Sequence, residues 1–180
     1  MSTRGQFLFV AKAGLIRTSN TTSVIEEAQI YRHSDSYPEI VLQDLKNFRR
    51  FNEGRNGDVP YLAANFIYFM KRQMEALGED VLVGYGVESA SHRIHGDEQY
   101  LYKIDVFPDG RWEVTIADLF SGANFGKEVD FDSAIYSWTG EFDKICEMFD
   151  VRKPKVSRIV EPKDILELTQ VLKTKPYRKD

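Results

Sequence analysis

Two stretches near the start of the chain alternate between apolar and polar residues, as half-buried β-strands do. They cover residues 7–11 and 24–32, and a turn signal lies between them at residues 20–23. This arrangement predicts that the first two strands form a hairpin.

Apolar positions then recur at helical spacing in two consecutive segments. Residues 41–48 follow Pro38, and residues 63–77 follow Pro60 and end at Gly78. Proline suits the first turn of a helix, and glycine is common just after the last one. The sequence therefore predicts two neighbouring helices, whose apolar stripes we assign to the core.

The second half of the chain returns to strand-like patterns. Residues 81–85 are a short apolar run, and residues 100–107 and 111–116 alternate on either side of a Pro-Asp-Gly turn, which predicts a second hairpin. Residues 120–132 are irregular, a helix is expected at about 141–149, and Ile165, Leu168 and Leu172 form the stripe of a last helix.

Hairpins and adjacent helices dominate this order, and no strand–helix–strand alternation is seen. The predicted fold is therefore α+β, with an antiparallel sheet of about five strands and helices packed on one face. We expect residues 1–150 to form a single domain and residues 151–180 to be a basic extension that contains a helix.

The composition narrows the class of protein. The 180 residues are 42% hydrophobic and 13% aromatic, which is too apolar for a disordered chain. The single cysteine, Cys146, excludes a disulfide within the chain and is predicted to be a buried, reduced thiol. No apolar run is long enough for a membrane span or a clear signal peptide, so a cytoplasmic location is expected.

The net charge of −4 conceals two opposed parts. Residues 151–180 have nine basic and four acidic residues, so the remaining 150 residues have a net charge of −9. A basic extension can bind nucleic acid or another anionic partner, and it can equally dock on its own acidic body. The basic residues that we select as candidate contacts are Arg49, Arg50, Arg55, Lys153, Lys155 and Arg158.

The segment from residue 128 to 150 is the most acidic part of the chain, with seven acidic residues and only Lys144 as a base. Such a segment could mimic nucleic acid or dock a basic partner. It could also be a solvated face, or pair with the basic extension.

The stretch Ile-Tyr-Arg-His-Ser-Asp-Ser-Tyr-Pro at residues 30–38 resembles an I-Y-R-H-x-D-G-Y-P motif. That motif belongs to a family of small uncharacterised proteins of bacteriophages, prophages and some bacterial and archaeal genomes. Residues 56–64 and 97–102 resemble further segments of the family, so the likeness covers about residues 5–120. Ser36 replaces the usual glycine. The resemblance implies a phage-like origin and one α+β domain, and it implies no activity.

Three histidines and a nearby carboxylate are the strongest candidates for metal chemistry. Imidazoles three residues apart can ligate Zn²⁺ or another first-row divalent metal, and a carboxylate can complete such a site. The alternative is that these are solvated loop residues. The candidate ligands are His33, His92, His95 and Asp97, with Glu98 or Asp35 as a base acting on bound water.

Four residues of the motif segment form a candidate functional loop, namely Arg32, His33, Asp35 and Tyr37. A nucleophilic serine is not favoured there, because the glycines of a nucleophile elbow are missing. The simpler interpretation is a turn in which Asp35 and Ser36 precede the first helix.

These observations support three hypotheses of different classes. The favoured one is a non-enzymatic interaction or regulatory protein that binds a protein partner or itself and has no cofactor. The second is a metal-dependent hydrolase or ligand-binding protein that uses the histidines. The third is a weak nucleic-acid binder that uses the basic extension.

Overall fold

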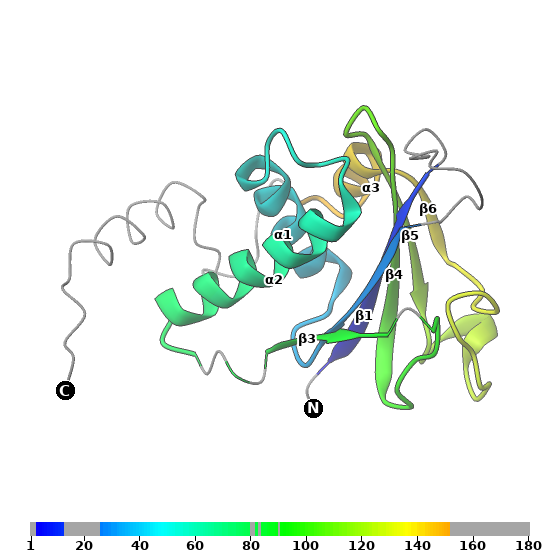
Figure 1. Ribbon diagram of the computed structural model, residues 1–180. Helices are drawn as coiled ribbons and strands as arrows, with labels where there is room; N and C mark the ends of the chain where they lie inside the picture. Colours follow the sequence, from blue (N-terminus) through cyan, green and yellow to red (C-terminus); the bar gives the residue numbers. More distant parts are fainter. Residues whose placement is uncertain (1–2, 13–25, 80–81, 83, 90, 152–180) are drawn as a thin grey trace.

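In the part of the chain that the structure describes, three α-helices lie against one face of a six-stranded sheet (Figure 1). This computed structural model describes residues 3–12, 26–79, 82, 84–89 and 91–151. The elements in chain order are β1 (Arg4–Ala11), β2 (Glu27–Arg32), α1 (Pro38–Phe51), α2 (Val59–Ala76), β3 (Tyr85–Glu88), β4 (Glu98–Val106), β5 (Trp112–Asp118), the 3₁₀ helix η1 (Gly122–Asn124), β6 (Trp138–Glu141) and α3 (Phe142–Met148).

The strands follow the order β3-β2-β1-β4-β5-β6 across the sheet. The α+β class and the antiparallel pairing of both predicted hairpins, β1–β2 and β4–β5, are confirmed, and the turn predicted at residues 20–23 lies outside the described residues. The expectation of an antiparallel sheet is wrong at its centre, where β1 and β4 run parallel. The chain passes through β2, both long helices and β3 before it returns as β4, and parallel strands require such a long crossover.

The sheet has six strands instead of about five because a short strand was missed. β6 has four residues and none of them is buried, so it has no apolar alternation to reveal it. Its strand character comes from pairing with β5, where Val114 lies opposite Gly140. The strand predicted at 81–85 is also displaced, since β3 begins at Tyr85.

The main core lies between the sheet and the helices. Phe66 of α2 is at its centre, and its ring lies 5.2–5.9 Å from the rings of Phe7, Phe9, Phe48 and Tyr85. These rings come from four different elements, so burying them joins both long helices to the sheet. The apolar stripes assigned to the core are confirmed.

Helix α3 closes the same face of the sheet near β5 and β6. Phe142 packs edge-on against Trp112 at 5.7 Å, and Ile145 and Cys146 belong to the same core. Burial raises the pKa of the Cys146 thiol to about 12, so it remains protonated at neutral pH. The predicted buried thiol is confirmed.

The opposite face of the sheet carries a smaller apolar cluster, which the segment after β5 covers in part. Leu8, Leu101 and Leu119 pack there against Phe131. The side chain of the buried Asn124 donates hydrogen bonds to the carbonyls of Asp118 and Ile135 at 3.1 and 2.6 Å, and accepts one from the Ile135 amide. The segment predicted to be irregular is therefore an ordered loop tied to the sheet.

The motif at residues 30–38 joins β2 to α1. Arg32 Nη1 lies 2.7 Å from Asp44 Oδ2 of α1, and both side chains are buried. The guanidinium also covers the Tyr85 ring, and its Nε donates to the Ser34 carbonyl. The Tyr102 hydroxyl donates to the Ser36 carbonyl. These contacts explain Arg32 and the buried Ser36 as structural residues.

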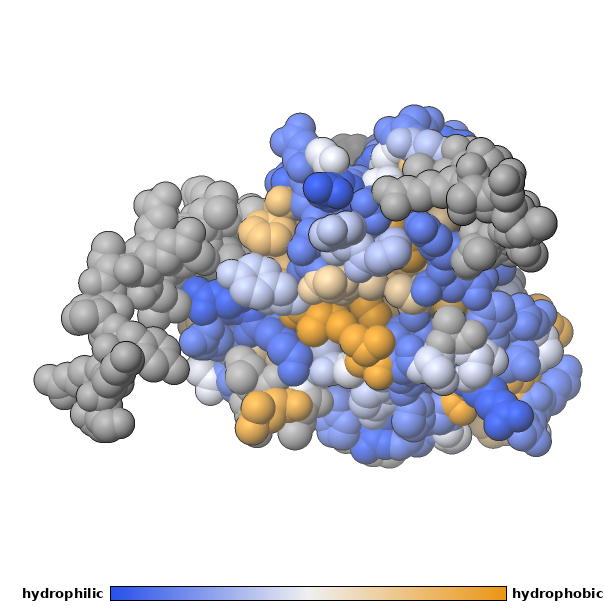
Figure 2. All heavy atoms as spheres, viewed as in Figure 1, coloured by the Kyte–Doolittle hydropathy of each residue, from blue (hydrophilic) through white to orange (hydrophobic). Residues whose placement is uncertain are grey.

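The two edges of the sheet are the short strands β3 and β6. Short edge strands limit unwanted pairing with other chains. The face seen in Figure 2 is mainly hydrophilic, with an apolar patch over β3, and Val87 of that strand is exposed. No helix of the described residues is long and apolar enough to cross a membrane. The predicted last helix and the basic extension from residue 152 onward lie outside the described residues.

Candidate functional site

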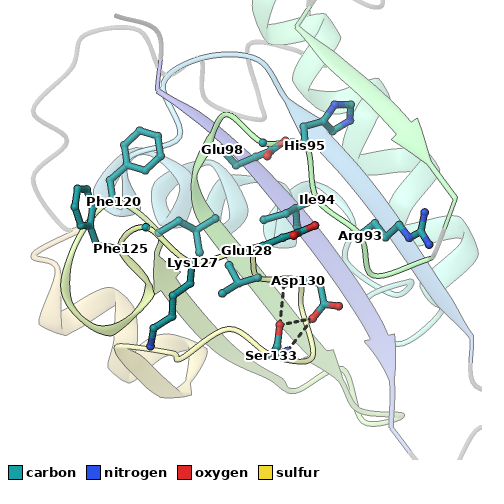
Figure 3. Close-up of a pocket in the computed structure, with 14 residues that line it drawn as sticks. Arg93, Ile94, His95, Glu98, Phe120, Phe125, Lys127, Glu128, Asp130 and Ser133 are labelled. Atoms are coloured by element: carbon teal, nitrogen blue, oxygen red, sulfur yellow. Dashed lines mark hydrogen bonds between the residues drawn. The ribbon is translucent and has the colours of Figure 1, made fainter.

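A hollow of about 900 Å³ opens on the face of the sheet that the helices leave uncovered (Figure 3). One wall is the segment before β4, which includes Arg93, His95 and Gly96. The other wall is the loop after β5, which includes Phe120 and Phe125. The hollow therefore lies between two loops that enter and leave the β4–β5 hairpin.

Glu98 lies at the base of this hollow, at the first position of β4. Its neighbour two residues on, Tyr100, faces the helices, and regular alternation would place Glu98 on that same side. The register prevents this, because Arg4 pairs with Glu98 and Gly5 pairs with Tyr100, which leaves Gln99 as an extra residue. A bulge of this kind turns a side chain toward the other face.

The Glu98 side chain is buried without a partner. The residue is 1% exposed, and neither carboxylate oxygen has a hydrogen-bond partner among the described residues. Burial raises the pKa of Glu98 to about 7. The nearby backbone amides of Glu98 and His95 and the His95 side chain lower it in part, and Glu88 raises it. Burial of a charge that its surroundings compensate only in part is costly, and such groups are typical of binding and catalytic sites.

A second carboxylate nearby, Glu88, is fully engaged by contrast. It accepts hydrogen bonds from the side chains of Gln6 and Gln29, the latter at 3.2 Å, and it shares one with His95 Nε2. The Tyr31 ring lies 5.0 Å from the His95 ring and completes this polar cluster. Of these two carboxylates, Glu98 is therefore the one that remains available to a ligand.

The outer wall of the hollow is aromatic and unusually exposed. Phe120 is 55% exposed and Phe125 is 70% exposed. Large apolar side chains beside a polar hollow mark surfaces that bind other molecules.

In Figure 3 Lys127 extends its ammonium group away from Glu98. Asp130 is held by Ser133, whose hydroxyl donates to it at 2.7 Å.

The four predicted metal ligands contact different residues. His92 bonds Asp132 and Glu27 through its two ring nitrogens, at 2.8 Å each, and Asp97 pairs with Arg4. His95 bonds Glu88, and His33 Nδ1 lies 3.2 Å from the Tyr31 hydroxyl. Within the described residues, no group of three or more His, Cys, Asp or Glu side chains is placed to hold a metal ion. The Tyr31 ring does contact both His33 and His95, with ring centroids 6.2 and 5.0 Å apart.

The predicted functional loop lies at a different place. Arg32 and Asp35 line a smaller hollow of about 320 Å³ between the two long helices and β3. Asp35 has a φ of 55°, as its predicted turn role requires. Tyr37 is partly exposed and packs against Tyr100. His33 points instead toward Tyr31, so the four residues do not form one site.

Of the basic residues selected as candidate contacts, Arg49 and Arg50 line one small hollow together with the acidic Glu53 and Asp143. Arg49 donates to the Gly110 carbonyl and lies over the rings of Trp112 and Phe142, which makes it part of the packing. Arg55 covers the Tyr61 ring. Arg50 is exposed on α1. Lys153, Lys155 and Arg158 lie outside the described residues.

The sequence pattern pointed to two residues of the hollow, His95 and Glu98, and not to its aromatic wall. Glu98 was expected only as an auxiliary base, and Phe120 and Phe125 were not selected. The available signal was two phenylalanines in a glycine-containing stretch without helix or strand periodicity, where burial of such large side chains is not assured.

His92 provides a pH-dependent link between the loop after β5 and β2. Hydrogen bonds to Asp132 and then Glu27 raise the pKa of His92 above its ordinary value of 6.5. The stabilisation is therefore complete below pH 6.5 and is lost as the pH rises through the pKa of the folded state. We expect His92→Gln to lower the free energy of unfolding by roughly 0.5–1 kcal/mol at pH 6 and by less at pH 8.5.

Urea unfolding at both pH values measures this difference. An equal loss at the two pH values in His92→Gln would show that the imidazolium form is not what stabilises the loop.

Comparisons with known proteins assign no family to this chain. No family model matches the chain, and neither the search of curated proteins nor the search of solved structures returned a match.

Proposed function

We propose that this protein is an interaction protein whose partner docks at the hollow beside β4. The observation that carries the proposal is the buried carboxylate of Glu98, which has no hydrogen-bond partner among the described residues although it lies at the base of a 900 Å³ hollow. A folded protein tolerates such a group more readily where binding compensates for it.

The surroundings of the hollow support a protein partner. Phe120 and Phe125 are exposed next to it, and aromatic side chains are enriched at the centres of protein interfaces. The loop that presents them is anchored by the buried Asn124. The aromatic surface is therefore held in place before the partner arrives, which reduces the entropy lost on binding.

Site-specific photocrosslinking in cells that carry the gene tests this proposal. A crosslinking amino acid at position 125 should give one discrete adduct, and the same residue at the exposed position 61 on α2 should give none. Unlabelled protein should compete the adduct away. Phe120→Ala should weaken it about tenfold, because truncating a central aromatic residue typically costs more than 1 kcal/mol.

Position 61 is a matched control, since Tyr61 is also an exposed aromatic residue but lies on the helical layer. Identical adducts from positions 125 and 61 would contradict the proposal, and so would the absence of any adduct at position 125.

A further inference from the structure

We infer that the hollow receives an arginine side chain of the partner, whose guanidinium pairs with the carboxylate of Glu98. This inference rests on the proposed function and specifies the chemistry of the same site. It follows from the charges inside the hollow, from its aromatic wall and from the two unpartnered oxygens at its base.

The charges that face the hollow are mainly negative. Glu98, Glu128 and Asp130 line it together. The basic residues Lys127 and Arg93 also belong to its lining, but Figure 3 shows both side chains extending outward, away from Glu98 and from each other. The hollow therefore favours a cation over an anion. The net charge of −9 on residues 1–150 also favours the approach of a basic partner.

Guanidinium fits the details better than ammonium. Both oxygens of Glu98 lack a partner among the described residues, and a guanidinium can donate to two carboxylate oxygens at once. Its flat face also stacks on aromatic rings, which the exposed Phe120 and Phe125 supply on the opposite wall. A lysine ammonium is a compact charge that would use only part of this arrangement.

The arginine side chain of the partner must displace part of the wall that contains Gly96 in order to reach the carboxylate of Glu98. Glu98 has almost no surface open to water, and Gly96, two residues earlier, belongs to the wall beside it. A Cβ atom built on Gly96 meets no atom within 4 Å, so the space beside this residue is open to an incoming side chain. Contact between a guanidinium and a carboxylate that is shielded from water is stronger than the same contact on an open surface.

Titration of the full-length protein with Nα-acetyl-argininamide, followed by NMR, tests the inference. We expect shifts of the amide signals of Phe125, Gly126 and Glu98, with a dissociation constant of about 1 mM, as is reasonable for one anchoring side chain. The lysine analogue should bind several-fold more weakly. The neutral citrulline analogue keeps the shape and loses the charge. Its affinity should be lower by about tenfold or more.

Two variants locate the binding. Glu98→Gln should lower the affinity for the arginine probe about tenfold. Glu53→Gln, which neutralises an exposed carboxylate after α1, should leave the affinity unchanged. The inference is overturned if citrulline binds as well as arginine, if Glu98→Gln binds as well as the parent protein, or if no shift is seen at about 20 mM arginine probe.

These outcomes are separable from the crosslinking result. A discrete adduct at position 125 without arginine binding would retain the proposed interaction site and reject the arginine anchor. Arginine binding without any adduct would retain the guanidinium site and reject a protein partner in those cells.

Discussion

Glu98→Gln is expected to make the protein more stable at pH 8 than the parent protein. Burial raises the pKa of Glu98 from its ordinary value of 4.5 to about 7, so the folded state binds this proton more tightly than the unfolded state. The stability that the proton contributes is complete below pH 4.5 and is lost as the pH rises through about 7. A neutral glutamine avoids that loss.

The expected gain is about 1–2 kcal/mol at pH 8, falling to near zero at pH 4.5. A shift of this size in a fully buried group would correspond to roughly 3 kcal/mol, and the open hollow beside Glu98 reduces it. Urea unfolding between pH 4.5 and 8.5 measures the difference. Glu98 interacts with His95 and Glu88, so the comparison should be made between variants at each pH and not across pH within one protein.

Glu88→Gln is the matched control for Glu98→Gln. Glu88 accepts hydrogen bonds from Gln6 and Gln29 and shares one with His95, so its replacement should destabilise the protein at pH 8. A loss of stability in Glu98→Gln would mean that this carboxylate has a stabilising partner after all. A gain in stability together with lost arginine binding would identify Glu98 as a residue kept for binding at a cost to the fold.

Arg32→Met is expected to lower the free energy of unfolding by about 3–5 kcal/mol at neutral pH. Arg32 and Asp44 form a buried ion pair, and removing one member leaves the other charge buried without its counter-charge. The guanidinium also covers the Tyr85 ring and donates to the Ser34 carbonyl, so the joint between β2 and α1 loses several contacts together.

The two single variants of this pair should differ in their response to acid. Burial raises the pKa of Asp44, whereas Arg32 lowers it, so Asp44 without Arg32 takes up a proton more readily. The defect in Arg32→Met should therefore shrink as the pH falls. The guanidinium in Asp44→Asn cannot lose its charge, and its defect should persist at low pH. Urea unfolding at pH 5 and pH 8 distinguishes them.

Lys144→Met removes one member of an exposed ion pair, Lys144–Glu141, and is the control. It should cost less than about 1 kcal/mol at either pH. A cost for Arg32→Met no larger than that of the control would show that the buried pair does not hold β2 to α1.

The placement of Arg32 also gives a physical meaning to the motif that resembles phage proteins. Arg32 anchors α1, and Asp35 adopts a left-handed turn conformation. Ser36 packs closely against Gly5, because a Cβ atom added to Gly5 would lie 2.8 Å from the Cβ atom of Ser36. Each of these is a requirement of the fold. Structural requirements of this kind can account for such a motif without any shared activity.

The hollow could be predicted from the sequence only in fragments. Glu98 stood beside two histidines in a polar stretch, and the following segment was irregular, so both walls were visible as loops. Their convergence depends on the β4–β5 hairpin, which was predictable. The direction of Glu98 depends on the extra residue Gln99 in the pairing of β1 with β4, and no local pattern reveals a pairing between strands about 90 residues apart.

The sequence by itself determined the α+β class, both hairpins, both long helices and the buried thiol of Cys146, because each depends on local periodicity and on turn or cap residues. Tertiary structure alone decided that β1 and β4 run parallel, that β6 completes the sheet, and that the histidines have separate partners. It also decided that Glu98, whose carboxylate has no hydrogen-bond partner among the described residues, lines the same hollow as Phe120 and Phe125. Such features depend on contacts between residues distant in the chain, which periodicity within a segment does not specify.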